Sequence, residues 1–430
     1  MYDIIKIFIS IALLITITGC TASTKSVEVK GHEKVFDNED IYILTALRAE
    51  QLKEYDASSS IFNTLYNKTD KKEYLYRSLQ NDLADDQSQR VIDRVDEILN
   101  NTLDDFVLVR FKIIALIKQD KLLKAKELAI SLVESSKEMD DYLLVSEIHV
   151  KLKEFNTAVK YLESAYIKEY NEEILDKMSI VLYVNLQRKK DAIAQLETHS
   201  RVYGCSKQIC SRLIGFYSDE NNIDGLLSTY LRLYKIDSNK KIANKIIQIY
   251  GYKKDYLSMI EFLEKNETDD DLLLQLYIQT KNYKKAAPLA HKLYKSNGDP
   301  SYLGQSAIFE YEGADDKNDK NMHDSIIKKL EEVIEAQKEG IYLNYLGYIL
   351  IDHDIDAKKG LEYIHEALKI EPNSIYYLDS LAWGYYKLGE CQKAKKIMDR
   401  VKNMDGSSNP EVVKHIEMIN KCIKIKKGKK

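Results

Sequence analysis

The sequence predicts an all-α protein, an α-α superhelix in which about eleven helical hairpins stack as a solenoid with a C-terminal capping helix. Three observations lead to this fold class. The chain has 430 residues, more than the roughly 250–300 at which single hydrophobic cores stop growing. It contains only 4 prolines and 16 glycines, which favours long helices over turn-rich β-structure. Small or apolar residues also recur about every 34 residues, as they do in stacked repeats.

Composition excludes several classes of function. The 64 basic and 68 acidic residues give a formal net charge of −4, so we expect no nucleic-acid partner. We find no Walker A run, no dinucleotide-binding glycine turn and neither the His-Glu-x-x-His nor the Gly-x-Ser-x-Gly motif. The acidic run at 315–320 lacks the glycine and the terminal glutamate of an EF-hand loop. We therefore expect no enzyme activity, no cofactor, no metal and no small-molecule substrate.

The chain begins with a short apolar run that predicts export. Residues Ile7–Ile17 are apolar apart from Ser10 and Thr16, whereas a helix that spans a bilayer needs about 20 apolar residues. The shorter length is typical of a secretory signal peptide, which we place at residues 1–19. The alternative is an uncleaved anchor in the inner membrane.

The end of this run, Ile17-Thr18-Gly19-Cys20, resembles the lipobox of bacterial lipoproteins. The resemblance implies signal cleavage between Gly19 and Cys20 and attachment of fatty acids such as palmitate to Cys20, which would hold the chain at a membrane. Thr21 stands where aspartate would signal retention at the inner membrane, so the resemblance favours the outer membrane, facing the periplasm. Residues 20–38 are polar and are expected to form a flexible tether.

Residues 39–406 repeat one unit, which is clearest at the end. Leu378, Leu381 and Tyr385 fall on one helix face, and Gly389 suits the end of that helix. Counting back through the second helix of each unit, the small or apolar markers are Ala394, Gly360, Ile326, Ala286, Met259, Leu226, Ala192, Ala158, Ala125, Val91 and Ser58. Their intervals are 33 or 34 residues, apart from one of 27 and one of 40.

This period and pattern resemble the tetratricopeptide repeat, most regularly over 340–406. Five tyrosines nine residues before a marker indicate packing between helices, with hydroxyls at the surface; they are Tyr183, Tyr217, Tyr250, Tyr277 and Tyr385. Leu226, Met259 and Ile326 replace the usual small residue, which predicts slightly wider hairpins there. The irregular intervals predict a shortened junction near Asn266–Asp271 and an insertion at Gly313–His323.

Residues 407–430 are expected to form a capping helix and a basic tail. Asn409 suits a helix cap and Pro410 the first turn. Apolar residues follow at Val412, Val413, Ile416, Ile419 and Ile423. Such a helix would cover the apolar end of the last repeat, which has no further neighbour.

Four cysteines besides Cys20 suggest two disulfides in an oxidising compartment. Cys205 and Cys210 are close in sequence, and Cys422 lies on the helix expected above Cys391. Buried free thiols are the alternative for each pair. Asn266 lies in Glu264-Lys265-Asn266-Glu267-Thr268, which resembles the extended sequon of bacterial N-glycosylation, at a junction where an exposed loop is expected.

The tetratricopeptide resemblance implies that first helices line a concave groove that binds a peptide or helix of another protein. The residues expected to project into it are Asn344, Tyr348, Ile351, Asp379, Trp383, Tyr386 and Lys387. The alternative for Trp383 is packing onto a neighbouring helix. We therefore expect a lipid-anchored periplasmic scaffold for another envelope protein. The alternatives are an accessory lipoprotein of a secretin or pilus, flagellar motor, outer-membrane assembly or polysaccharide-export machine, or an activator of a cell-wall enzyme.

Overall fold

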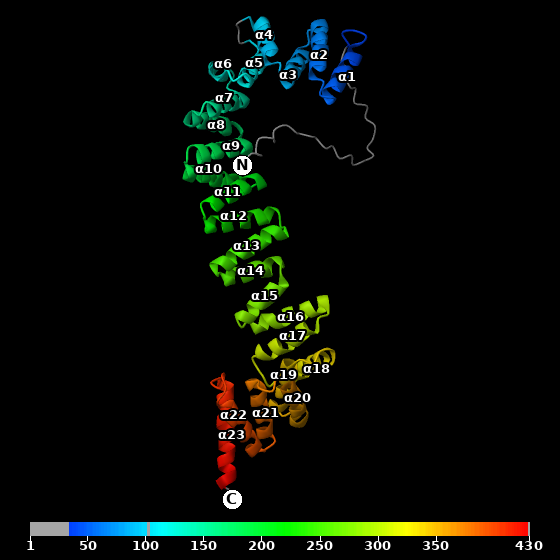
Figure 1. The fold of residues 1–430 in the computed structure, drawn as a ribbon, viewed down its shortest axis with the longest axis vertical. Helices are drawn as coiled ribbons and strands as arrows, with labels where there is room; N and C mark the ends of the chain where they lie inside the picture. The colour runs from blue at the N-terminus through cyan, green and yellow to red at the C-terminus, as the bar shows by residue number, and fades with distance from the viewer. Residues whose placement is uncertain (1–33, 101–103, 429–430) are drawn as a thin grey trace. The chain divides into compact units, whose positions relative to one another are not determined.

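The computed structural model describes residues 34–100 and 104–428, with side chains described as far as Lys424. These residues form 23 α-helices and one π-helical segment, and none of them lies in a β-strand. None of the described helices is long and apolar enough to cross a membrane. The chain divides into two compact units, Met1–Leu196 and Glu197–Lys430. Figure 1 shows consecutive helices lying side by side within each unit.

The described part of the first unit consists of short helices. They are α1 (Glu39–Gln51), α2 (Tyr55–Thr69), α3 (Lys72–Ala84), α4 (Ser88–Leu99), α5 (Phe106–Lys118), α6 (Leu122–Ser136), α7 (Met139–Lys151), α8 (Phe155–Glu169), α9 (Glu172–Ile180), the π-helical segment η1 (Val181–Asn185) and α10 (Lys189–Tyr203), within which the division falls. One apolar core runs through α3 to α7 and includes Leu79, Ile113 and Leu132, all fully buried.

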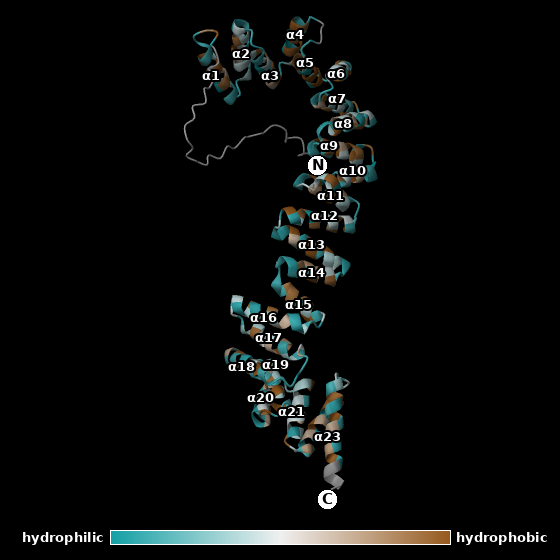
Figure 2. Cartoon of the chain, turned by 180° about the vertical axis from the view of Figure 1, so that it is seen from behind, coloured by the Kyte–Doolittle hydropathy of each residue, from teal (hydrophilic) through white to brown (hydrophobic). Residues whose placement is uncertain are grey.

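The second unit continues the same pattern. Its helices are α11 (Lys207–Asp219), α12 (Ile223–Ile236), α13 (Lys240–Lys253), α14 (Tyr256–Asn266), α15 (Asp270–Gln279), α16 (Tyr283–Asn297), α17 (Pro300–Glu312), α18 (Lys320–Ala336), α19 (Gly340–Asp352), α20 (Ala357–Ile370), α21 (Ile375–Lys387), α22 (Cys391–Val401) and α23 (Pro410–Gly428). Figure 2 shows apolar and polar residues interspersed along these helices, as expected where each helix buries only part of its surface.

The predicted fold class is confirmed. The described helices form eleven consecutive hairpins, α1–α2 to α21–α22, followed by α23. Every predicted marker residue lies on the second helix of its hairpin, and Ser58, Ala125, Ala158, Ala192 and Ala394 are fully buried there. A small side chain at this position lets the neighbouring backbone approach closely. The 34-residue period is therefore the length of one hairpin with its turns.

In one hairpin, the predicted marker Leu226 lies one residue after the small residue that packs between the helices. Leu226 is only half-buried, and its neighbour Gly225 faces the first helix of the hairpin instead. A Cβ atom added to Gly225 would lie 2.5 Å from the ring of Tyr217. The expectation of a wider hairpin at Leu226 is therefore wrong, because the small residue is present one position earlier.

The five repeating tyrosines lie between helices, and two of their hydroxyls pair with glutamates. All but Tyr385 are buried. The Tyr217 hydroxyl donates to Glu197 Oε1 at 2.7 Å, and the Tyr277 hydroxyl to Glu264 Oε1 at 2.6 Å. Burial, followed by the hydrogen bond to the glutamate, raises the pKa of both tyrosines well above the ordinary value.

Most hairpin turns use one residue in the left-handed conformation. With φ between 51° and 75°, these residues are Lys53, Asp86, Asp120, Lys153, Gln187, Asn221, Lys254, Lys281, Asp354 and Gly389. The connection between α17 and α18 is longer, at residues 313–319, and has no such residue among those described. It coincides with the insertion that the interval of 40 predicted.

Candidate functional site

The residues expected to line a groove near the C-terminus lie on α19 and α21. Figure 1 shows α23 beside α21 and α22. Helix α23 packs against both α21 and α22. Its inward residues Val412 and Ile419 are buried in one apolar cluster with Ala382 and Met398. The helix therefore caps the last hairpin, as predicted, and also extends onto the face of the first helices.

Trp383 is the centre of this covered face. It is the only tryptophan of the chain, and its side chain is 4% exposed. The His415 ring of α23 stacks on one side of it, with centroids 4.0 Å apart, and Tyr386 also stacks on it at 4.8 Å. The indole Nε1–H donates to Asp352 Oδ1 at 2.8 Å. Trp383 therefore packs against neighbouring rings and does not project into solvent.

Two polar contacts join α23 to the first helices. His415 Nδ1 lies 2.9 Å from Asp379 Oδ2, a donor–acceptor pair that is almost fully buried. The Tyr348 hydroxyl donates to Glu411 Oε1. Burial, the nearby charge of Asp352 and the hydrogen bond to Glu411 raise the pKa of Tyr348 far above its ordinary value, so this hydroxyl stays protonated and remains a donor.

The expectation that the seven groove residues project into an open groove is wrong. Asn344, Ile351, Asp379 and Trp383 are buried, and the remaining three, Tyr348, Tyr386 and Lys387, are half-buried. Lys387 Nζ donates to the Asp352 carbonyl at 2.7 Å and pairs with Asp354. The structure does bring the seven together on α19 and α21, and the chain's own C-terminal helix packs on the part of this face that holds Tyr348, Asp379 and Trp383.

A polar cavity of about 560 Å³ lies beside this face, where the α17–α18 insertion meets the end of α19. Its lining residues are Asn318, Lys320, His323, Asp324, Asp352, His353, Asp354 and Ile355. The rings of His323 and His353 are 4.0 Å apart, and burial together with the neighbouring imidazole lowers the pKa of His353. Among the described residues, no group of histidine, cysteine, aspartate or glutamate is arranged to hold a metal ion.

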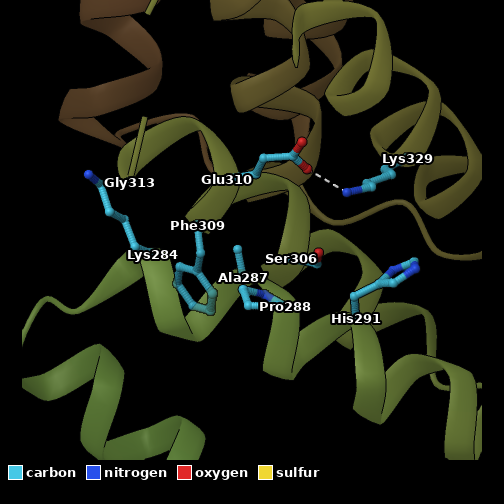
Figure 3. A pocket seen from close by; sticks show the side chains of 9 residues that line it. All are labelled: Lys284, Ala287, Pro288, His291, Ser306, Phe309, Glu310, Gly313 and Lys329. Carbon is cyan, nitrogen blue, oxygen red and sulfur yellow. Dashed lines mark hydrogen bonds and ion pairs between the residues drawn. The ribbon is translucent and has the colours of Figure 1, made fainter. Parts of the chain in front are cut away.

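A second cavity, of about 370 Å³, opens between α16, α17 and α18 (Figure 3). It is lined by apolar groups of Ala287, Pro288 and Phe309, and Lys329 forms an ion pair with Glu310 at its edge. Nδ1 of His291 has no hydrogen-bond partner, and burial lowers the pKa of this histidine. The cavity is a cleft between the second helix of one hairpin, α16, and the next hairpin, α17–α18 (Figure 3).

The cysteine pairs lie together as the spacing suggested. Cys205 and Cys210 form a disulfide between the end of α10 and α11, with Cα atoms 5.5 Å apart. A second disulfide joins Cys391 of α22 to Cys422 of α23, with Cα atoms 6.1 Å apart. It ties the covering helix to the hairpin that it caps.

Asn266 is not in an exposed loop, contrary to expectation. It is the last residue of α14, is half-buried, and its Nδ2 donates to the Phe262 carbonyl at 2.7 Å. Glycosylation there remains a prediction.

The predictions for the N-terminus lie outside the described residues. They concern Gly19 and Cys20, the signal peptide and the tether as far as residue 33.

Sequence reasoning missed three residues that complete the covered face: Asp352, Glu411 and His415. Asp352 ends α19, and the other two lie on α23. The signal for His415 was present, because it falls between Val412 and Ile419 on the apolar stripe of a helix. A histidine in such a stripe needs a polar partner when it is buried.

Comparison with known proteins adds only fold-level likenesses. No family model and no curated protein matches the chain. A chain of the Naa15/Naa10 assembly bound to HypK-THB is 15% identical with a TM-score of 0.35, over 80% of this chain and 65% of that one, just under two thirds of its length. Yeast Tom70 is 13% identical with a TM-score of 0.33, over 91% and 97% of the two chains. A tetratricopeptide repeat protein from Parabacteroides merdae is 13% identical with a TM-score of 0.29, over 66% and 100%.

The assignment of the fold depends on the chain's own hairpins. Their length of about 34 residues, the buried small residue in most second helices and the capping helix are those of a tetratricopeptide-like array. The chain thus has a tetratricopeptide-like repeat fold.

Proposed function

We propose that this protein is a lipid-anchored scaffold of the bacterial periplasm, attached to the outer membrane through Cys20, that binds a peptide or helix of another envelope protein. The observation that carries the proposal is the run of eleven consecutive helical hairpins. Extended repeat surfaces of this kind bind proteins through many side chains. The proposal includes the absence of catalytic activity.

The anchor is supported by the short apolar run and by Gly19-Cys20 that follows it. Several acyl chains on one cysteine would hold the chain at the membrane effectively permanently. The test is metabolic labelling with an alkyne fatty acid, followed by separation of the inner and outer membranes. We expect label in the outer-membrane fraction for the wild type and none for Cys20→Ala. Equal labelling of the two chains would contradict the anchor.

The partner surface can be tested with a photo-crosslinking amino acid at exposed positions of first and second helices. Ile114 on α5 and Ile278 on α15 are exposed on first helices, whereas Leu123 on α6 and Leu257 on α14 are exposed on second helices. We expect a discrete crosslinked envelope protein from the first-helix positions alone. Crosslinks of equal yield from all four positions, or none from any, would contradict binding along the first helices.

A further inference from the structure

Two buried hydrogen-bond acceptors on α19 and α21 have no donor although α23 packs on this face. Asp379 is 6% exposed and uses Oδ2 to accept from His415, while its Oδ1 has no hydrogen-bond partner. Oδ1 of Asn344, which is 9% exposed, also lacks a partner. Each of these two residues is the fifth of its helix, on α21 and α19. Buried acceptors without a donor are rare and unfavourable, so a ligand with more donors would fit this face better.

The charge on this face favours a cation. Asp352 and Asp379 lie close to Trp383 or to its stacked partner His415. Lys387, which lies over the Trp383 ring, already pairs with Asp354. An additional basic group beside Trp383 would therefore meet an acidic surface with an aromatic ring at its centre.

Arginine has the geometry that His415 lacks. A guanidinium donates two parallel hydrogen bonds to one carboxylate and so can satisfy both oxygens of Asp379. Its flat surface also stacks on tryptophan as a cation–π contact, in the place that the His415 imidazole takes at 4.0 Å. Neutral imidazole donates only one hydrogen bond.

We propose that the face of α19 and α21 is a binding site for an amphipathic helix of a partner protein with arginine at the position of His415, and that α23 is its internal occupant. This rests on the proposed function and names the partner's chemistry. The partner helix carries an apolar residue three positions before the arginine and another four positions after it, as Val412 and Ile419 flank His415. We infer arginine at this position because its positive charge complements the carboxylate of Asp379.

The disulfide controls access to the face. Helix α23 is joined to α22 by residues 402–409 and again by Cys391–Cys422. A short tether gives an effective concentration of roughly millimolar, and the second link prevents α23 from leaving. Reduction by a dithiol transfers two electrons and two protons to the two sulfurs, while the dithiol closes to a cyclic disulfide. Helix α23 is then held only through one end and can be displaced.

The test uses the full chain and fluorescent peptides of residues 409–430. One peptide carries His415→Arg and the other His415→Ala, and binding is read by fluorescence polarisation and by the emission of Trp383. With dithiothreitol present, we expect the arginine peptide to bind at least tenfold more tightly than the alanine peptide. With the disulfide intact, we expect at least tenfold weaker binding. The double variant Cys391→Ser, Cys422→Ser should behave as the reduced chain without reductant.

Asp379→Asn should remove the preference for arginine, and Asp399→Asn, an exposed acid of α22 that pairs with Lys395, should keep it. Circular dichroism checks that each variant keeps the helical content of the wild type. Equal affinity for the two peptides, or equal binding by oxidised and reduced chains, would overturn the proposal. So would a doubled mass on reduction, which would indicate exchange of α23 between two copies. None of these outcomes affects the crosslinking test of the scaffold, so the two proposals can fail separately.

Discussion

Glu39 shows how one side chain fixes the start of the array. Its carboxylate accepts from Lys71 Nζ at 2.7 Å, from the Tyr74 hydroxyl at 2.8 Å and from the Val35 backbone N–H at 2.8 Å. The hydrogen bond from Lys71, helped by those from Val35 and Tyr74, lowers the pKa of Glu39 to about 2. The ionised carboxylate therefore links α1 to the beginning of α3.

We predict that Glu39→Gln destabilises the first hairpin at pH 7 by about 1–3 kcal/mol, the range for losing charged hydrogen bonds at a buried site. A carboxylate with a depressed pKa stabilises the fold above its unfolded pKa of about 4.5, and the effect is lost as pH falls toward about 2. The difference in free energy of unfolding between the wild type and Glu39→Gln should therefore become smaller as the pH falls from about 4.5 to about 2. Amide hydrogen exchange in α1 and α2 measures it.

Asp40→Asn provides the control, because Asp40 is an exposed neighbour that pairs with the exposed Lys34. Exposed ion pairs contribute little, so its exchange rates should match those of the wild type. A pH-independent difference between Glu39→Gln and the wild type would show that the carboxylate charge is not the cause.

The residues with positive φ at the hairpin turns could not all be predicted from their residue types. Gly389 was assigned from the sequence because glycine adopts positive φ without a steric penalty. Lys53, Gln187 and Lys281 take the same conformation, although it costs most residues about 1–2 kcal/mol. Packing of each hairpin against its neighbours outweighs this cost, so the turns follow the repeat period and not the local residue type.

At the scale of the element, hairpin packing distinguishes two glycines of the second unit. Gly225 on α12 touches the Tyr217 ring, whereas Gly215 in the middle of α11 has no atom within 4 Å of a Cβ built on it. One glycine is required by a close approach between helices. The other only weakens its helix.

We predict opposite effects of alanine at these positions. Gly225→Ala should destabilise the hairpin by about 1–3 kcal/mol, because the added methyl group overpacks the Tyr217 ring. Gly215→Ala should stabilise it by about 0.5–1 kcal/mol through higher helix propensity. Hydrogen exchange of α11 and α12 amides provides the comparison, and the same sign for both variants would contradict the packing assignment.

Helix α23 was predictable from the sequence, but its contacts with the candidate site were not. Its existence and its start at Asn409-Pro410 follow from cap residues and apolar spacing, which are local. The contact between His415 and Asp379, 36 residues apart, depends on how the helix crosses two others, and periodicity does not encode that. The π-helical turn at Val181–Asn185 was missed for a similar reason, because the marker interval around it stays regular.

At the scale of the molecule, the apolar clusters among the described residues are local to a few neighbouring helices. The first unit contains a core through α3 to α7, and the second contains separate clusters around α19 to α23. In repeat proteins, stability is close to a sum of terms from each repeat and its nearest neighbours. This dependence on neighbouring repeats could be predicted from the sequence. A 34-residue period indicates which helices pack against each other, and it says little about repeats that are far apart in the chain.

We predict that core truncations act locally. Leu132→Ala in α6 and Leu346→Ala in α19 both remove fully buried side chains, at a cost of about 2–5 kcal/mol each. Leu132→Ala should speed amide exchange in α5 to α7 and leave α19 to α22 unchanged, and Leu346→Ala should do the reverse, as mass spectrometry of exchanged peptides can show. Each variant serves as the control for the other. Faster exchange throughout the chain in both variants would mean that the repeats unfold as one cooperative body, and the nearest-neighbour description would then fail.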